Sequence, residues 1–244
     1  MSSPAREQAL ARIRANVERF GRHIYAVSGG QSPRFVYTIG VSPAAGVELV
    51  LAGGAHFTAT EAGRILNALG ARDPGELIEG AAFDLGELGR FSLGPVASAW
   101  VDELLLGACD FYGEPALRAL QVLPEAARRT VDVPDLSRPF APDLEPVWRY
   151  LFEPWDHPVS DRVEAVTDLA ALRGEPVTEA ARWEEDQWEL FAGAGPDVPP
   201  EDVRVVPLGV LLGADPSLAP VLALALGEAL RREGRDDPWQ RWGR

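Results

Sequence analysis

Apolar residues in this chain of 244 residues come in short runs that end at glycine or proline. Clear examples lie at residues 35–39 and 47–52, and residues 23–27 alternate with a bias towards β-branched and aromatic side chains. Runs of this length and composition are typical of strands, and the glycines and prolines between them are typical of turns. The pattern therefore predicts several short strands connected by loops, and residues 120–123 are expected to form a further strand.

Two segments show helical periodicity instead. In residues 4–20 apolar side chains recur every three or four positions among arginines and glutamates, and Gly21 follows. A second helix is expected to begin with Thr58 or Thr60 as its N-cap and to stop at Gly70. Helices of this kind beside short strands predict an α+β fold, with antiparallel sheets flanked by helices.

Prolines crowd residues 131–158, and the aromatic residues Trp148, Tyr150, Phe152 and Trp155 lie among them. Such a segment is expected to pack onto the fold and not to act as a free linker. We therefore predict an α+β domain at 1–135, a packed connector at 136–160 and a smaller α+β module at 161–244.

Within the predicted C-terminal module, residues 176–183 and 187–191 are expected to form a hairpin across an acidic turn. Residues 203–212 are the best strand-like run, and a short helix is expected after Asp215 as its N-cap. Propensity favours helix before Gly227 and leaves the conformation of the remaining residues open.

The charge balance limits the classes of function. Asp and Glu total 37 against 23 basic residues, which gives a net charge of −14, and every basic residue is arginine. Without lysine, Schiff-base, phosphate-loop-lysine and lysine-base mechanisms are excluded. An acidic surface without a dense basic stretch repels phosphate backbones, so we expect no nucleic acid as a partner.

The remaining bulk features indicate a cytoplasmic protein of bacterial type. The arginine, alanine, glycine and proline richness is typical of a GC-rich genome, and Cys109 is the single cysteine. The N-terminus lacks the apolar core of a signal peptide, and no apolar run is long enough to cross a membrane. We therefore expect no membrane association and no internal disulfide.

The three histidines, His23, His56 and His157, share no ligand spacing, so we expect no metal site, and nothing indicates a cofactor. His56 follows a glycine-rich loop and precedes the predicted helix start at Thr58, an arrangement that could hold an anion. Cys109 could pair with His23 or His56 as a nucleophile, but an inert core thiol is favoured.

Several motifs occur together between residues 20 and 124. They are FGRHI at 20–24, FVYTIG at 35–40, ELV at 48–50, LN at 66–67, YG at 112–113 and LQVLP at 120–124. By these motifs residues 10–135 resemble the bacterial domain-of-unknown-function-4262 family, which implies no particular activity. Arg22 and Leu123 stand where the family usually has aromatic residues.

The C-terminal third is similar to a small module seen beside this family. The similarity lies in WELFAG at 188–193, VVPL at 205–208, DPSL at 215–218, Gly227, the arginines at 231–232 and the PW pair at 238–239. It implies a strand after Gly227.

The leading functional hypothesis is a non-enzymatic binding or interaction protein: accessory, stress-related or toxin-neutralising, with an acidic or aromatic face for a protein partner. The alternative is a small-molecule hydrolase or transferase with a site around His23, Tyr37 and Gln121. A third possibility is a structural subunit of an oligomer, for which the sequence contains no specific indication. The candidate pocket residues are His23, Tyr37, Thr38, His56, Asn67, Tyr112 and Gln121.

Overall fold

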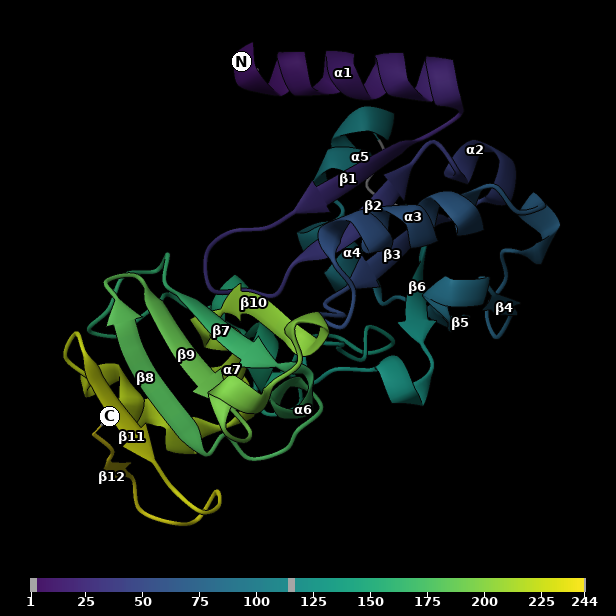
Figure 1. The fold of residues 1–244 in the computed structure, drawn as a ribbon. Coiled ribbons are helices and arrows are strands. Elements are labelled where there is room, and N and C mark those ends of the chain that lie inside the picture. Colours follow the sequence, from purple (N-terminus) through teal and green to yellow (C-terminus); the bar gives the residue numbers. More distant parts are fainter. Residues whose placement is uncertain (1–3, 114–116, 244) are drawn as a thin grey trace.

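The computed structural model describes residues 4–113 and 117–243. Its N-terminal half is built on a six-stranded sheet with the order β1-β2-β3-β6-β5-β4 (Figure 1). All neighbouring strands in this sheet are antiparallel except β3 and β6, which are parallel. The strands are β1 (His23–Val27), β2 (Phe35–Ile39), β3 (Glu48–Ala52), β4 (Ala82–Asp84), β5 (Arg90–Pro95) and β6 (Ala119–Pro124).

The C-terminal half contains a second six-stranded sheet with the order β10-β7-β9-β8-β11-β12. Here β7 and β9 are the one parallel pair, so both sheets are mixed. The predicted α+β class is confirmed, with this addition to the predicted antiparallel pairing. The strands are β7 (Glu164–Asp168), β8 (Glu179–Glu184), β9 (Gln187–Phe191), β10 (Val203–Pro207), β11 (Glu228–Arg231) and β12 (Gln240–Arg241).

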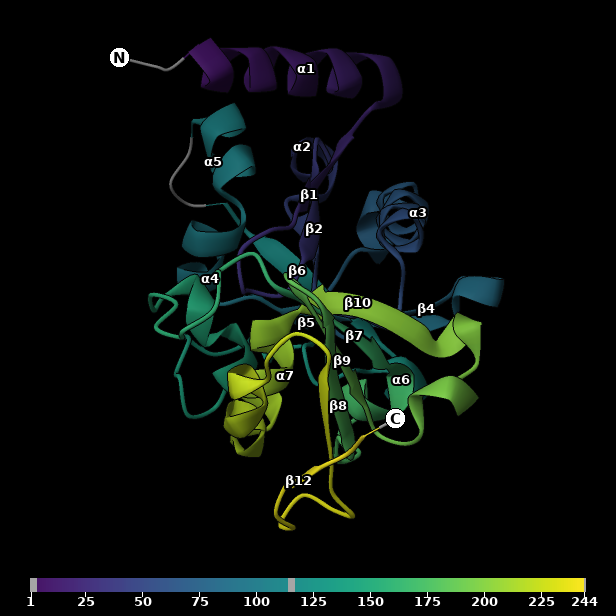
Figure 2. The ribbon, with the colours of Figure 1, turned by 60° about the vertical axis from the view of Figure 1, so that its left-hand side comes forward.

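Helices cover both faces of the first sheet. In Figure 2, α3 lies on one side of its strands while α4 and α5 lie on the other. The helices are α1 (Pro4–Phe20), α2 (Ser42–Ala45), α3 (Ala59–Gly70), α4 (Ser98–Leu104), α5 (Leu106–Tyr112), α6 (Leu169–Leu172) and α7 (Leu208–Ala214). Short 3-10 helices are η1 (Pro74–Glu76), η2 (Gly86–Leu88), η3 (Ala126–Arg128), η4 (Pro146–Leu151), η5 (Gly195–Asp197), η6 (Pro200–Asp202) and η7 (Pro216–Ala223).

The sequence signals at α3 act as expected. Thr58 caps the helix by accepting a hydrogen bond from the backbone N–H of Glu61, and the Glu61 carboxylate accepts from the N–H of Thr58 in return. This reciprocal capping box satisfies two backbone donors at the helix start. Four buried side chains, Ala62, Ile65, Leu66 and Leu69, then pack against the sheet.

The predicted strand at 203–212 is wrong in its second half. Strand β10 stops at Pro207, and Leu208 begins helix α7, whose first six residues are all buried. An apolar run does not by itself distinguish a buried strand from a buried helix. Proline cannot donate a ladder hydrogen bond, and this ends the strand. After Gly227 the chain forms β11, as the family module implied, and the segment before it is the 3-10 helix η7.

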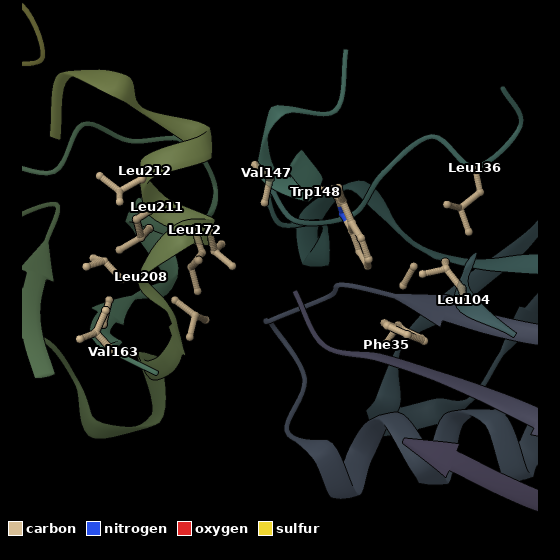
Figure 3. Close-up of a cluster of buried hydrophobic side chains, with 14 of the residues drawn as sticks. Phe35, Leu104, Leu136, Val147, Trp148, Val163, Leu172, Leu208, Leu211 and Leu212 are labelled. Carbon is tan, nitrogen blue, oxygen red and sulfur yellow. The ribbon is translucent and has the colours of Figure 1, made fainter. Parts of the chain in front are cut away.

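The proline-rich connector is part of the core. Trp148 is fully buried, and its indole N–H donates to the carbonyl of Asp132 at 2.9 Å. Figure 3 shows Trp148 between Phe35 and Leu104 of the N-terminal half and Leu208 of helix α7. The connector therefore joins the two halves into one apolar cluster, and Trp148 is not available as part of an aromatic binding face.

The contact between the two halves, here called the seam, also contains polar bonds. The buried side chain of Gln31 donates to the carbonyl of Val163 at 2.9 Å and accepts from the N–H of Gly209 at 2.7 Å. Arg204 of β10 donates to the carbonyls of Ala55 and His56. Each bond pairs a side chain with the backbone of the other half, which fixes their relative position.

Among the described helices, none is both long enough and apolar enough to cross a bilayer.

Close packing at the seam gives a test at helix α7. A Cβ at Gly213 would lie 2.6 Å from Cα of Val147 and 2.7 Å from the carbonyl oxygen of Pro146, whereas a Cβ at Gly63 of α3 meets nothing within 4 Å. We expect Gly213→Ala to lower the free energy of unfolding by about 1–3 kcal/mol through overpacking. Gly63→Ala should raise it by up to about 1 kcal/mol. Urea denaturation measures both, and equal effects of the two substitutions would contradict the packing.

Candidate functional site

A buried carboxylate, Glu48 at the start of β3, is the centre of the most extensive polar cluster in the N-terminal half. Its oxygens accept hydrogen bonds from the hydroxyls of Thr38 and Tyr112, both at 2.5 Å. They also accept from the backbone N–H groups of Gly40, at 2.9 Å, and Ser42, at 3.0 Å, and from Val41 between them. The cluster joins β2, the following turn, β3 and α5.

The electrostatics of this cluster are those of a satisfied structural charge. Burial raises the pKa of Glu48, while the hydrogen bonds from Thr38, Tyr112 and the backbone act in the opposite direction. Burial also raises the pKa of Tyr112, and the adjacent carboxylate adds to the shift. Thr38 completes its own bonding by accepting from the N–H of Leu49 at 2.9 Å. No free nucleophile or base is left among these described groups.

Tyr37 and Gln121 lie in one row across the sheet, because Tyr37 pairs with Val50 and Val50 pairs with Gln121. Their polar ends nevertheless have separate partners. The Tyr37 hydroxyl accepts a hydrogen bond from the N–H of Gly107 at 3.1 Å. The Gln121 side-chain amide donates to the carbonyl of Pro134 at 2.7 Å and accepts from the N–H of Leu136 at 3.2 Å. Both side chains therefore anchor loops.

The other candidates lie elsewhere. The Nδ1 atom of His23 lies 2.8 Å from the Asn16 amide nitrogen, and burial and Arg12 lower the pKa of this histidine. Asn67 accepts a long hydrogen bond from Arg22 in a separate place on α3. Of the seven predicted pocket residues, the structure brings only Thr38 and Tyr112 onto a common polar partner. Their ligand-binding role stays a prediction.

Two further predictions concern Cys109 and metals. Burial, Asp102 and Asp110 raise the pKa of the Cys109 thiol, so the thiolate needed for nucleophilic attack is disfavoured. Over residues 4–113 and 117–243, no group of three or more His, Cys, Asp and Glu side chains is placed to hold a metal ion.

A cavity of about 270 Å³ lies at the seam. Its wall includes Arg34 and Asp132 from the N-terminal half and Arg204 from β10. In Figures 1 and 2, β10 is the strand of the second sheet that faces the N-terminal half. The remaining lining residues are Pro33, Gly53, Ala55, Phe57, Thr58, Val203, Val205, Val206, Pro207 and Val210.

Arg34 is the unusual group in this cavity. It donates one hydrogen bond, from Nη2 to the carbonyl of Phe57 at 2.8 Å, and its buried Nε has no partner among the described residues. No carboxylate of the described chain lies within 4.0 Å to form an ion pair with it. Burial lowers its pKa, and the more distant Asp132 and Glu61 offset this only in part. A partly buried guanidinium without a counter-charge is energetically unfavourable.

Neighbouring charges act on Arg34 without forming an ion pair with it. Asp132 is buried and accepts from the N–H of Ala55, and burial raises its pKa, while its hydrogen bonds and the charge of Arg34 act in the opposite direction. Arg204 donates to carbonyl oxygens and forms no ion pair with a described carboxylate. The cavity wall therefore carries the guanidinium of Arg34 without an ion pair, the already bonded guanidinium of Arg204 and one buried carboxyl group.

His56 lies beside this cavity and does not add to its positive charge. Its Nδ1 atom is buried without a partner in the described chain, and burial, together with Arg173, Arg128 and Arg204, lowers the pKa of the ring, which favours the neutral imidazole. The sequence had indicated an anion site before the helix at Thr58. The structure shows that the capping box occupies this helix terminus, and that the unpaired charge beside it is Arg34.

The sequence did not indicate the three charged residues of the cavity. Arg34 lies 98 residues before Asp132, which lies 72 residues before Arg204, and the three meet only at the seam. Glu48 did carry a local signal, since it is a carboxylate inside the otherwise apolar run at 47–52. An isolated charge in a buried strand is expected to have specific partners.

Together these features define an α+β protein with two mixed sheets and, between them, a cavity that contains an arginine without an ion pair in the described chain. Residues 16–128 match the family described as Domain of unknown function (DUF4262), so this part of the chain is a domain of that family. The resemblance drawn from the sequence motifs is thereby confirmed. Neither the curated proteins nor the solved structures gave a match to the chain.

The buried threonines of the two sheets give a test of the Glu48 cluster. Thr38→Val removes a donor to Glu48 and the acceptor of the Leu49 N–H, so we expect the free energy of unfolding to fall by about 1–3 kcal/mol. Thr167, equally buried in β7, has a hydroxyl without a partner in the described chain. Thr167→Val should therefore leave the free energy of unfolding unchanged or raise it by up to about 1–3 kcal/mol, because it removes a buried hydroxyl without a partner. Similar losses in the two variants, measured by urea denaturation, would show that Thr38 has no special role.

The raised pKa of Glu48 predicts the direction in which the free energy of unfolding changes with pH. Because the folded state holds the Glu48 proton more tightly than the unfolded chain, this group favours folding most below its ordinary value of 4.5 and less as the pH rises through its folded value. Glu48→Gln removes this titration. We expect the free energy of unfolding of the natural protein, minus that of the variant, to decrease with rising pH across this window. Urea denaturation at a series of pH values measures it, and an increasing difference would mean that the hydrogen bonds dominate over burial.

Proposed function

We propose that this protein is a non-enzymatic binding protein that holds an anionic group of its ligand in the cavity at the seam. The observation that carries the proposal is Arg34, a partly buried guanidinium with one hydrogen bond and no ion pair in the described chain. A bound oxyanion supplies both the counter-charge and the missing acceptors, and the planar guanidinium fork suits carboxylate and phosphate oxygens.

The chemistry of the remaining polar groups supports binding over catalysis. Glu48, Thr38 and Tyr112 are bonded to one another, the pKa of the Cys109 thiol is raised, and His23 and His56 lie apart with lowered pKa values. A hydrolase or transferase needs an activated nucleophile or a base next to its substrate. The separate partners of His23, Tyr37 and Gln121 give that alternative no support.

We propose further that the ligand is part of a macromolecular partner. The net charge of −14 favours a partner with a basic surface, in keeping with an accessory or toxin-neutralising role in the bacterial cytoplasm. The aromatic residues of the connector contribute little to such a face, since Trp148 is buried and Phe152 is 39% exposed.

The anion site is tested by the effect of acetate on stability. In the natural protein, acetate at ten times its Kd should raise the free energy of unfolding by about 1.4 kcal/mol over chloride of equal ionic strength. Arg34→Met should abolish this increment. Without acetate the variant should be as stable as the natural protein or more so, because a poorly solvated charge is removed.

Arg64 provides the matched control, since it is an exposed arginine on α3 that does not line the cavity. Arg64→Met removes the same charge and should keep the acetate response in full. Comparison between variants also cancels the general effect of salts on protein stability. An acetate response that is equal in the natural protein and in Arg34→Met would overturn the proposal.

A further inference from the structure

The cavity at the seam is apolar over most of its wall, in contrast to its charged end. Phe57, Val206 and Val210 are buried residues on this wall, and Val205 at its mouth is 55% exposed. A bare inorganic anion at Arg34 would leave this wall in contact with water. A ligand that combines an anionic head with an apolar side chain would cover it.

The size of the cavity limits that side chain. About 270 Å³ corresponds to roughly nine water molecules at about 30 Å³ each. This is room for a carboxylate together with an aliphatic side chain of about four carbon atoms, such as that of leucine.

The cavity also runs along an unpaired strand edge. Strand β10 is at the edge of the second sheet, and five consecutive residues, 203–207, line the cavity. The N–H of Leu208 bonds the carbonyl of Val163, which continues the antiparallel register of β10 with β7. In this register Val206 and Arg204 direct their backbone groups to β7, so Val205 directs its N–H and C=O to the open side.

Neighbouring groups restrict where a strand could pair. The carbonyl of Val203 accepts from Arg204, and Pro207 has no N–H. No hydrogen bond from another described segment reaches the N–H or C=O of Val205. One residue of β10 therefore offers a donor and an acceptor directly beside the anion site and the apolar wall.

We propose that the cavity binds the C-terminal end of a peptide or protein chain whose last residue is apolar, which specifies the ligand of the site proposed above. The terminal carboxylate pairs with Arg34, the last side chain occupies the apolar wall, and the backbone N–H and C=O of the residue two positions before the last hydrogen-bond Val205, groups that N-acetylleucine does not have. Charge complementarity selects this occupant, since a guanidinium without an ion pair favours an anion in a largely apolar cavity. Terminal-carboxylate capture and strand addition are both established modes of peptide recognition.

The experiment is a titration by isothermal calorimetry with three probes. They are a six-residue acetylated peptide that ends in leucine, the same peptide with an amidated C-terminus, and N-acetylleucine. We expect the acid peptide to bind at least tenfold tighter than N-acetylleucine, because it adds the backbone bonds to Val205. The amidated peptide should bind at least tenfold more weakly than the acid peptide. The Arg34→Met variant should bind neither the acid peptide nor N-acetylleucine.

Two variants of one residue isolate the strand pairing. Val205→Pro removes the backbone donor at an edge position where proline is tolerated, whereas Val205→Ala trims the side chain and keeps the donor. In Val205→Pro the acid peptide should fall to the affinity of N-acetylleucine. In Val205→Ala it should stay within about threefold of the natural protein, and N-acetylleucine should bind both variants alike. Circular dichroism confirms that each variant is folded.

The outcomes separate this inference from the anion site itself. If N-acetylleucine and the acid peptide bind equally through Arg34, the ligand is a small organic acid and the peptide inference is wrong, while the anion site stands. If the amidated peptide binds as tightly as the acid, the carboxylate role is wrong. If N-acetylleucine, the acid peptide and acetate all fail to bind, the anion site is wrong as well.

Discussion

The structure depends on side chains that bond the backbone of the opposite half across the seam. Gln31 bonds the backbone at Val163 and Gly209, and Arg204 bonds the carbonyls of Ala55 and His56. Because buried amides and carbonyls are costly to leave unpaired, these bonds hold the two sheets at a fixed separation. A fixed separation is also what maintains a cavity with charged residues from both halves, and a binding site on rigid elements loses less entropy when it is occupied.

Two buried charges of this protein differ in how they are stabilised. Glu48 is surrounded by donors from its own chain, so its carboxylate serves to hold β2, β3 and α5 together. Arg34 has a single acceptor and no ion pair in the described chain, so it serves no comparable structural purpose. Proteins seldom bury an arginine in this way unless a partner completes its bonding. The contrast is the physical reason for placing the ligand at Arg34 and not at the polar cluster around Glu48 and Thr38.

The sequence predicted what local patterns control. Strand β2, an N-cap at Thr58 or Thr60 and the packing of the proline-rich connector follow from alternation, capping preference and aromatic content. The run at 203–212 was mispredicted because apolar content is shared by buried strands and buried helices, and helices α4 and α5 gave no clear periodic signal. The cavity could not be predicted, since Arg34, Asp132 and Arg204 come from distant segments and meet only through the seam.

The most direct measurement of the central claim is the NMR signal of the Arg34 side-chain N–H, assigned by its disappearance in Arg34→Met. This group has no acceptor in the described chain, so its proton and nitrogen resonances should move when N-acetylleucine is added and supplies one. The corresponding signal of Arg204, which already bonds carbonyl oxygens, should move much less. Movement of the Arg34 signal to a saturable limit is the expected result. An unchanged Arg34 signal under conditions in which the ligand is bound would contradict a role for this guanidinium.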